Sequence, residues 1–88
     1  MMISFTETGW SDYLFWAGQD KKTLKRINNM NEDIERNGHD GIGKPEPLRH
    51  SMAGWWSRRI DEKHRLVYRL IGDTTIEIAQ CRGHYDDK

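Results

Sequence analysis

Residues 64–82 read HRLVYRLIGDTTIEIAQCR and contain two runs in which apolar and polar side chains alternate. The first run has apolar side chains at positions 66, 68 and 70, and the second has Ile76 and Ile78. Gly72-Asp73-Thr74 separates them and favours a tight turn. The stretch therefore predicts a β-hairpin with one face in the core and the other largely polar.

Further strand-like runs precede this hairpin. Residues 48–52 and 55–60 are separated by Ala53-Gly54, and Asp61-Glu62-Lys63 leads into the run at 64. Spacers this short suit hairpins, so residues 48–82 predict a four-stranded antiparallel meander. Residues 2–5 are mostly apolar and are consistent with an opening strand.

Two helices are expected between the opening strand and the meander. The first has an apolar stripe with helical spacing at Trp10, Tyr13, Leu14 and Ala17, which is expected to face the core and to leave Phe15 and Trp16 outside it. Asp20 is a natural N-cap for the second helix, and Gly38 ends it. The apolar positions of the second helix keep a period of 3.6 residues at Leu24, Ile27, Met30 and Ile34.

Together these elements predict a single α+β domain spanning residues 1–88. Two N-terminal helices pack on one side of a curved antiparallel sheet, in the order β-α-α-β-β-β-β. No internal repeat is evident.

The charges are unevenly distributed although they sum to zero. Residues 1–43 contain five Lys and Arg and seven Asp and Glu, a net of −2, whereas residues 44–82 contain eight and five, a net of +3. A neutral total argues against indiscriminate nucleic-acid binding. Because residues 44–82 carry the net positive charge, an RNA ligand is expected to dock on this second half.

A reducing, cytoplasmic location is expected. Cys81 is the only cysteine, which excludes an internal disulfide and any site built from several cysteines. The N-terminus lacks the features of a signal peptide, and no apolar run approaches the length of a membrane span.

A proline-flanked carboxylate is the first candidate for chemistry. In Gly43-Lys44-Pro45-Glu46-Pro47, both Lys44 and Glu46 precede a proline, which disfavours helix and predicts extended backbone. A carboxylate on so stiff a support is suited to act as a general base. A proline-stiffened linker with a solvated Glu46 is the alternative.

The basic half supplies partners for Glu46. Arg65 offers paired donors to phosphate oxygens, His84 can donate a proton near neutral pH, and Tyr85 can stack on a base. These residue types suit RNA cleavage by its own 2′-hydroxyl, which requires a base, a cation and an acid. Four other cations are candidate RNA contacts: Lys44, Arg49, Arg58 and Arg59. The alternative for the three arginines is that they only balance neighbouring carboxylates.

No metal or other cofactor is predicted. His39, His50 and His64, taken with Cys81, have spacings that match no familiar ligand pattern. The proposed cleavage chemistry needs no metal.

Five segments together resemble one protein family. The sequence is similar to the YoeB/Txe family of bacterial type II toxins, within the RelE/ParE superfamily, over almost its whole length. The segments that carry the resemblance are 10–16 (WSDYLFW), 43–48 (GKPEPL), 54–60 (GWWSRRI), 64–68 (HRLVY) and 81–85 (CRGHY).

The resemblance implies a ribosome-dependent mRNA endonuclease that works in the A site of the 70S ribosome and leaves a 2′,3′-cyclic phosphate and a 5′-hydroxyl. It implies a cognate antitoxin of the Phd/YefM type and a homodimer. By the same resemblance, Glu46 is the general base, Arg65 stabilises the phosphate, His84 is the general acid and Tyr85 is the terminal aromatic. Arg49 takes a position where relatives commonly have lysine, and Arg59 contacts RNA.

Two other functions remain open. A ParE-like protein would inhibit a DNA topoisomerase without cleaving anything, since fold alone does not determine function. A plain interaction module would dimerise through Trp10 and Trp16. Neither function requires the set formed by Glu46, Arg65, His84 and Tyr85.

Overall fold

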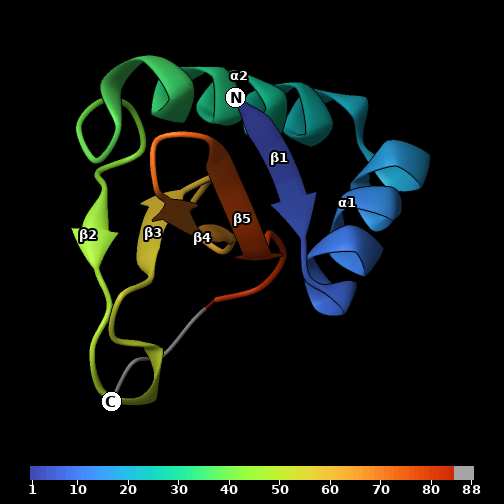
Figure 1. The fold of residues 1–88 in the computed structure, drawn as a ribbon. Helices are drawn as coiled ribbons and strands as arrows, with labels where there is room; N and C mark the ends of the chain where they lie inside the picture. The colour runs from blue at the N-terminus through green and yellow to red at the C-terminus, as the bar shows by residue number, and fades with distance from the viewer. Residues whose placement is uncertain (85–88) are drawn as a thin grey trace.

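Two helices pack against a five-stranded sheet in the computed structural model of the protein, which describes residues 1–84 (Figure 1). The predicted order of helices and strands is confirmed, and Tyr85 lies outside the described residues. The elements are β1 (Met2–Phe5), α1 (Glu7–Gln19), α2 (Lys21–Asn37), β2 (Glu46–Pro47), a 3₁₀ helix (His50–Met52), β3 (Trp56–Arg59), β4 (Arg65–Ile71) and β5 (Thr75–Gln80).

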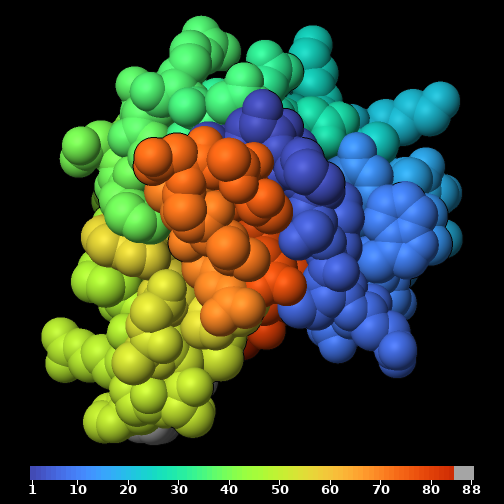
Figure 2. Space-filling model, viewed as in Figure 1, coloured from blue at the N-terminus to red at the C-terminus, as the bar shows by residue number. Residues whose placement is uncertain are grey.

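The sheet has the strand order β1-β5-β4-β3-β2. The pairs from β2 to β5 are antiparallel, as predicted, but β1 runs parallel to β5, with Ile3 opposite Ile76. Short turns force neighbouring strands to be antiparallel, whereas β1 reaches the sheet through two helices and is free of that constraint. Figure 2 shows β1 in dark blue alongside the orange β4–β5 hairpin.

The predicted strand at residues 48–52 is wrong. The edge strand β2 is Glu46–Pro47, and the chain then forms a 3₁₀ turn at His50–Met52. Local hydrogen bonds cause the change: Met52 N donates to the Arg49 carbonyl at 3.0 Å, and Ala53 N donates to the His50 carbonyl at 3.1 Å. The other three strands lie within the predicted runs.

Helix α2 contributes the face that the sequence predicts. Ile27, Met30 and Ile34 are buried, and Leu24 packs against them at the margin of the core. Asp20 caps the helix by accepting from the amides of Lys22 and Thr23, and Gly38 ends it with a φ of +64°. The strands complete the core with Leu66, Tyr68, Ile76 and Ile78.

Helix α1 is rotated from its predicted orientation, and of the predicted stripe Tyr13 packs against the core while Trp10, Leu14 and Ala17 are exposed. Trp10 and Leu14 are 49% and 50% exposed, whereas Trp16 is buried. The inward face begins at Gly9, where an added Cβ would clash with the Ile78 carbonyl oxygen. Because Gly9 has no apolar side chain, a search for apolar spacing does not place it on the inward face with Trp16.

Neither helix of the described residues combines the length and apolar character needed to cross a bilayer.

Candidate active site

Strand register places Glu46, Arg59 and Arg65 on the same face of the sheet. Glu46 is opposite Ser57 and Ser57 is opposite Val67, while Arg59 is opposite Arg65. Residues paired across strands share a face, and residues two apart on one strand do so as well. This face is the one turned away from α2, because Arg58 and Leu66, paired on the other face, are buried.

The spacing on this face suits a substrate held between Glu46 and Arg65. The two residues are two strands and two positions apart, which separates their Cα atoms by roughly 12 Å. Val67 is on the same face, two positions after Arg65 and across Ser57 from Glu46. It is fully buried, so this face is not polar throughout as expected. Side chains of this length can reach a common phosphodiester from both sides.

Glu46 is exposed on the edge strand, which leaves its carboxylate open to a ligand. The backbone before it is not uniformly extended, because Lys44 has a φ of +52°. Lys44 avoids the right-handed helical region, as expected before a proline, but it does so in the left-handed region. The prediction of extended backbone is therefore wrong at Lys44.

Gly43 anchors the loop that leads to Glu46. Its carbonyl accepts from Arg59 N at 2.6 Å, and its φ of +82° favours glycine. An added Cβ would lie 2.5 Å from Met30 Cε and 3.0 Å from the Arg59 carbonyl oxygen, so a side chain would crowd this passage between α2 and β3. The support under Glu46 is therefore a packed loop as well as two prolines.

Arg65 begins β4 with its guanidinium partly engaged. Nη1 donates to the carbonyls of Asp61 at 2.7 Å and His64 at 3.1 Å. Within residues 1–84, Nε and Nη2 have no hydrogen-bond partner. These nitrogens can donate to the oxygens of a phosphate.

His84 adjoins Arg65 through the backbone. Arg65 N donates to the Gly83 carbonyl at 2.9 Å, so the residue after Gly83 lies next to the start of β4. The His84 side chain is exposed. Tyr85, the fourth predicted catalytic residue, lies outside the described residues.

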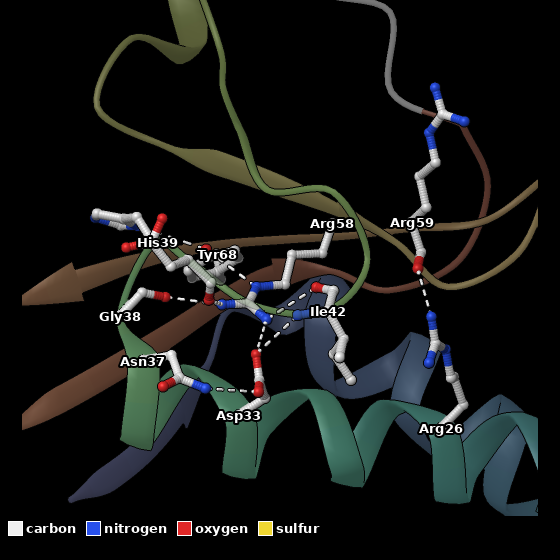
Figure 3. A network of polar contacts seen from close by, with 10 residues as sticks. Arg26, Asp33, Asn37, Gly38, His39, Ile42, Arg58, Arg59 and Tyr68 are labelled. Atoms are coloured by element: carbon white, nitrogen blue, oxygen red, sulfur yellow. Dashed lines mark hydrogen bonds and ion pairs between the residues drawn. The ribbon is translucent and has the colours of Figure 1, made fainter.

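The prediction that Arg58 contacts RNA is wrong. Its side chain has no exposed surface, since Arg58 faces the helices while its neighbour Arg59 faces the opposite side. All five of its N–H groups are used. Figure 3 shows the guanidinium enclosed by Asp33, Tyr68 and the loop after α2, with acceptors on Asp33 Oδ2, Tyr68 Oη and the carbonyls of Gly38, Asp40 and Ile42.

This buried pair has electrostatic consequences. The hydrogen bond from Arg58 lowers the pKa of Asp33, and further bonds from Ile42 N and Asn37 act in the same direction. Burial lowers the pKa of His39, helped by the Arg58 charge. His39 stacks on Trp56 with ring centroids 3.9 Å apart and so completes this cluster.

The remaining predicted RNA contacts, Lys44, Arg49 and Arg59, are exposed. A cavity of about 350 Å³ lies beside Lys44 and Arg59, and none of Arg49, Glu46 and Arg65 lines it. Figure 3 shows the Arg59 side chain directed away from Arg26, which donates to the backbone carbonyls of Ile60 at 3.4 Å and Arg59 at 3.5 Å. The lining of the cavity comes from Arg26, Gly43, Lys44, Arg59, Ile60, Asp61 and Glu62.

Sequence reasoning missed the residues that hold the chain after β5. Asp12 Oδ2 accepts from Cys81 N at 3.1 Å, Trp16 Nε1 donates to the Cys81 carbonyl at 2.8 Å, and His64 Nδ1 accepts from Gly83 N at 2.8 Å. The only available signal was that these residues fall in the resembling segments 10–16 and 64–68. The structure also shows that Trp16, being buried, cannot form a dimer surface, which corrects that part of the interaction-module hypothesis.

No group of three or more His, Cys, Asp or Glu side chains within the described part of the chain could hold a metal ion.

Comparison with known proteins gives relatives of the same length. YoeB toxins from Synechocystis sp. and Streptomyces coelicolor are 54% and 52% identical to this chain, each over 97% of it and over 98% and 100% of their own length.

The fold is likewise shared with solved structures. A YoeB/ParE toxin from Agrobacterium tumefaciens superposes with a TM-score of 0.93 at 44% identity, over 97% of this chain and 100% of that one. A YoeB dimer and a YoeB–YefM complex from Staphylococcus aureus each superpose with a TM-score of 0.90, at 44% and 42% identity, over 97% of this chain and 98% of theirs. A family model described as the YoeB-like toxin of bacterial type II toxin-antitoxin system matches residues 5–85. The chain therefore belongs to the YoeB-like toxins of bacterial type II toxin-antitoxin systems.

Proposed function

We propose that the protein is a ribosome-dependent endoribonuclease that cuts mRNA in the A site. One observation carries the proposal: the register puts Glu46 and Arg65 on one accessible face, and the backbone of Gly83 brings His84 to the same end of β4. A protein that only binds a partner has no chemical need for a base, a cation and an acid at one place.

The proposed reaction is an internal transesterification. Glu46 removes the proton of the 2′-hydroxyl, and the 2′-oxygen attacks the adjacent phosphorus while the bond to the 5′-oxygen breaks. Arg65 stabilises the charge on the phosphorane, and His84 gives the departing 5′-oxygen its proton. The products are a 2′,3′-cyclic phosphate and a 5′-hydroxyl, and Tyr85 is proposed to stack on a base near the cut.

Lys44, Arg49 and Arg59 are proposed to bind the RNA backbone. The chain has no net charge, so its own affinity for free RNA should be low. The ribosome then supplies the positioning that the protein does not.

The proposed protein partners follow from the relatives. Structures of the Staphylococcus aureus toxin contain a dimer and a complex with YefM. We expect this protein, acting in the cytoplasm, to form a homodimer and to be inhibited by a YefM-like antitoxin.

The test is a cleavage assay with purified protein and programmed ribosomes. Wild-type protein should cut mRNA in the presence of EDTA and leave the two predicted ends. Glu46→Ala and His84→Gln should each lower the cleavage rate by about 10²-fold or more.

Arg65→Gln should be similarly impaired, and Arg69→Gln is the matched control. Arg69 lies on the same strand but pairs with Glu77 at 2.7 Å, so its loss should leave cleavage near the wild-type rate. Intact mRNA together with inhibited DNA supercoiling would favour the topoisomerase inhibitor and reject the nuclease.

A further inference from the structure

We propose that His64 is a positioning residue that holds the backbone before His84 against Arg65. The inference rests on the proposed function for its effect on rate, but the contact itself can be tested without any cleavage. His64 belongs to the turn before β4 and has no place in the proposed chemistry.

The contact is a two-point attachment of one residue. Gly83 N donates to His64 Nδ1 at 2.8 Å, and the Gly83 carbonyl accepts from Arg65 N at 2.9 Å. Both polar groups of the Gly83 backbone are therefore bound by adjacent residues of the chain. Gly83 has a φ of +86°, a conformation in which glycine is not strained.

His64 is itself held through both its ring and its backbone. Its ring meets Trp16 edge to face, with centroids 4.8 Å apart, and Trp16 is buried with its indole N–H bonded to the Cys81 carbonyl. The backbone of His64 is fixed by Asp61, whose Oδ1 accepts from His64 N at 2.7 Å. Contacts that do not involve Gly83 therefore orient the Nδ1 atom toward the Gly83 amide.

The hydrogen bond requires one particular form of the imidazole. An Nδ1 atom that accepts from an amide has no proton, so the proton of the neutral ring is on Nε2. A phenyl ring can replace the contact with Trp16 but not the acceptor. An asparagine offers an acceptor near Nδ1 but not the ring.

The His64 contact should affect the position of His84 because β5 ends at Gln80, four residues earlier. Beyond that strand, the chain reaches His84 through contacts with side chains as well as backbone bonds. A displacement of about 1 Å at a catalytic group can lower a rate by about 10²-fold. Freeing Gly83 should therefore slow cleavage while leaving the core intact.

The rate test compares His64→Phe, which keeps a ring, with His64→Asn, which keeps an acceptor, at saturating ribosome concentration. His64→Phe should lower the cleavage rate by about 10-fold or more and keep a thermal midpoint close to wild type. His64→Asn should cleave faster than His64→Phe although it is less stable. Wild-type cleavage by His64→Phe, or activity that merely follows stability in both variants, would overturn the proposal.

The contact test measures amide hydrogen exchange by NMR. In His64→Phe, the Gly83 amide should exchange at least about 10-fold faster than in wild type, while amides within β4 keep their protection. Unchanged Gly83 exchange would overturn the inference even if the protein cleaves RNA. Faster exchange in a protein that never cleaves would instead reject the proposed function and retain the contact.

Discussion

Replacing buried Arg58 with methionine is expected to lower the free energy of unfolding by about 3 kcal/mol. Removing one partner of a buried ion pair typically costs about 3–5 kcal/mol. The lower end applies because the Asp33 side chain is 17% exposed and the loop carbonyls can turn to water. A domain of this length has about 4–13 kcal/mol in total, so the change is large.

The assay is urea unfolding followed by tryptophan fluorescence, in a cycle of Arg58→Met, Asp33→Asn and the double variant. The Arg58→Met midpoint should fall, and its thermal midpoint should drop by about 12 °C or more. The double variant should lose less than the sum of the single losses, by at least about 1 kcal/mol, because the second substitution removes a charge already left unpaired.

Arg69→Met is the matched control. Arg69 also bonds a carboxylate on a neighbouring element, Glu77, but is 44% exposed, so its loss should cost under about 1 kcal/mol. The reasoning is refuted if Arg58→Met unfolds within about 0.5 kcal/mol of wild type, or if the two single losses are additive.

Two further predictions concern titratable groups. The pKa of Asp33 is lowered in the folded protein, so its stabilising contribution is present above its unfolded value of 3.8 and is lost as pH falls through the folded value; urea unfolding should show acid destabilisation below about pH 4 that is shallower in Asp33→Asn. Burial raises the pKa of Cys81 to about 12, so a thiol reagent at neutral pH should label it only after unfolding; rapid labelling of the native protein would contradict its buried position.

Local pattern was sufficient for α2 and for the hairpin. Ile27, Met30 and Ile34 recur at helical spacing between an Asp20 cap and a Gly38 stop, so every signal lies within a few residues of the next. The alternation of β4 and β5 worked for the same reason. It failed for α1, whose contact with the sheet depends on the absence of a side chain at Gly9.

The candidate site was only partly predictable. Residue types and resemblance suggested Glu46, Arg65 and His84, and the register places Glu46 and Arg65 on one face. Adjacent arginines looked equivalent in sequence, yet Arg59 is exposed and Arg58 is buried. Alternation says that two neighbours face opposite sides, but only packing against α2 decides which side is inside.

By itself the sequence determined the order of elements, the second helix, the central hairpin and the resemblance to a toxin family. Tertiary structure alone decided that β1 joins β5 in parallel, that Arg58 binds Asp33 across 25 positions, and that Trp16 binds Cys81 across 65. Capping and periodicity act over a few residues, whereas these contacts depend on which distant segments meet. For that reason only the tertiary structure shows how the candidate site is supported, by Arg58 binding the loop after α2 and by His64 binding Gly83.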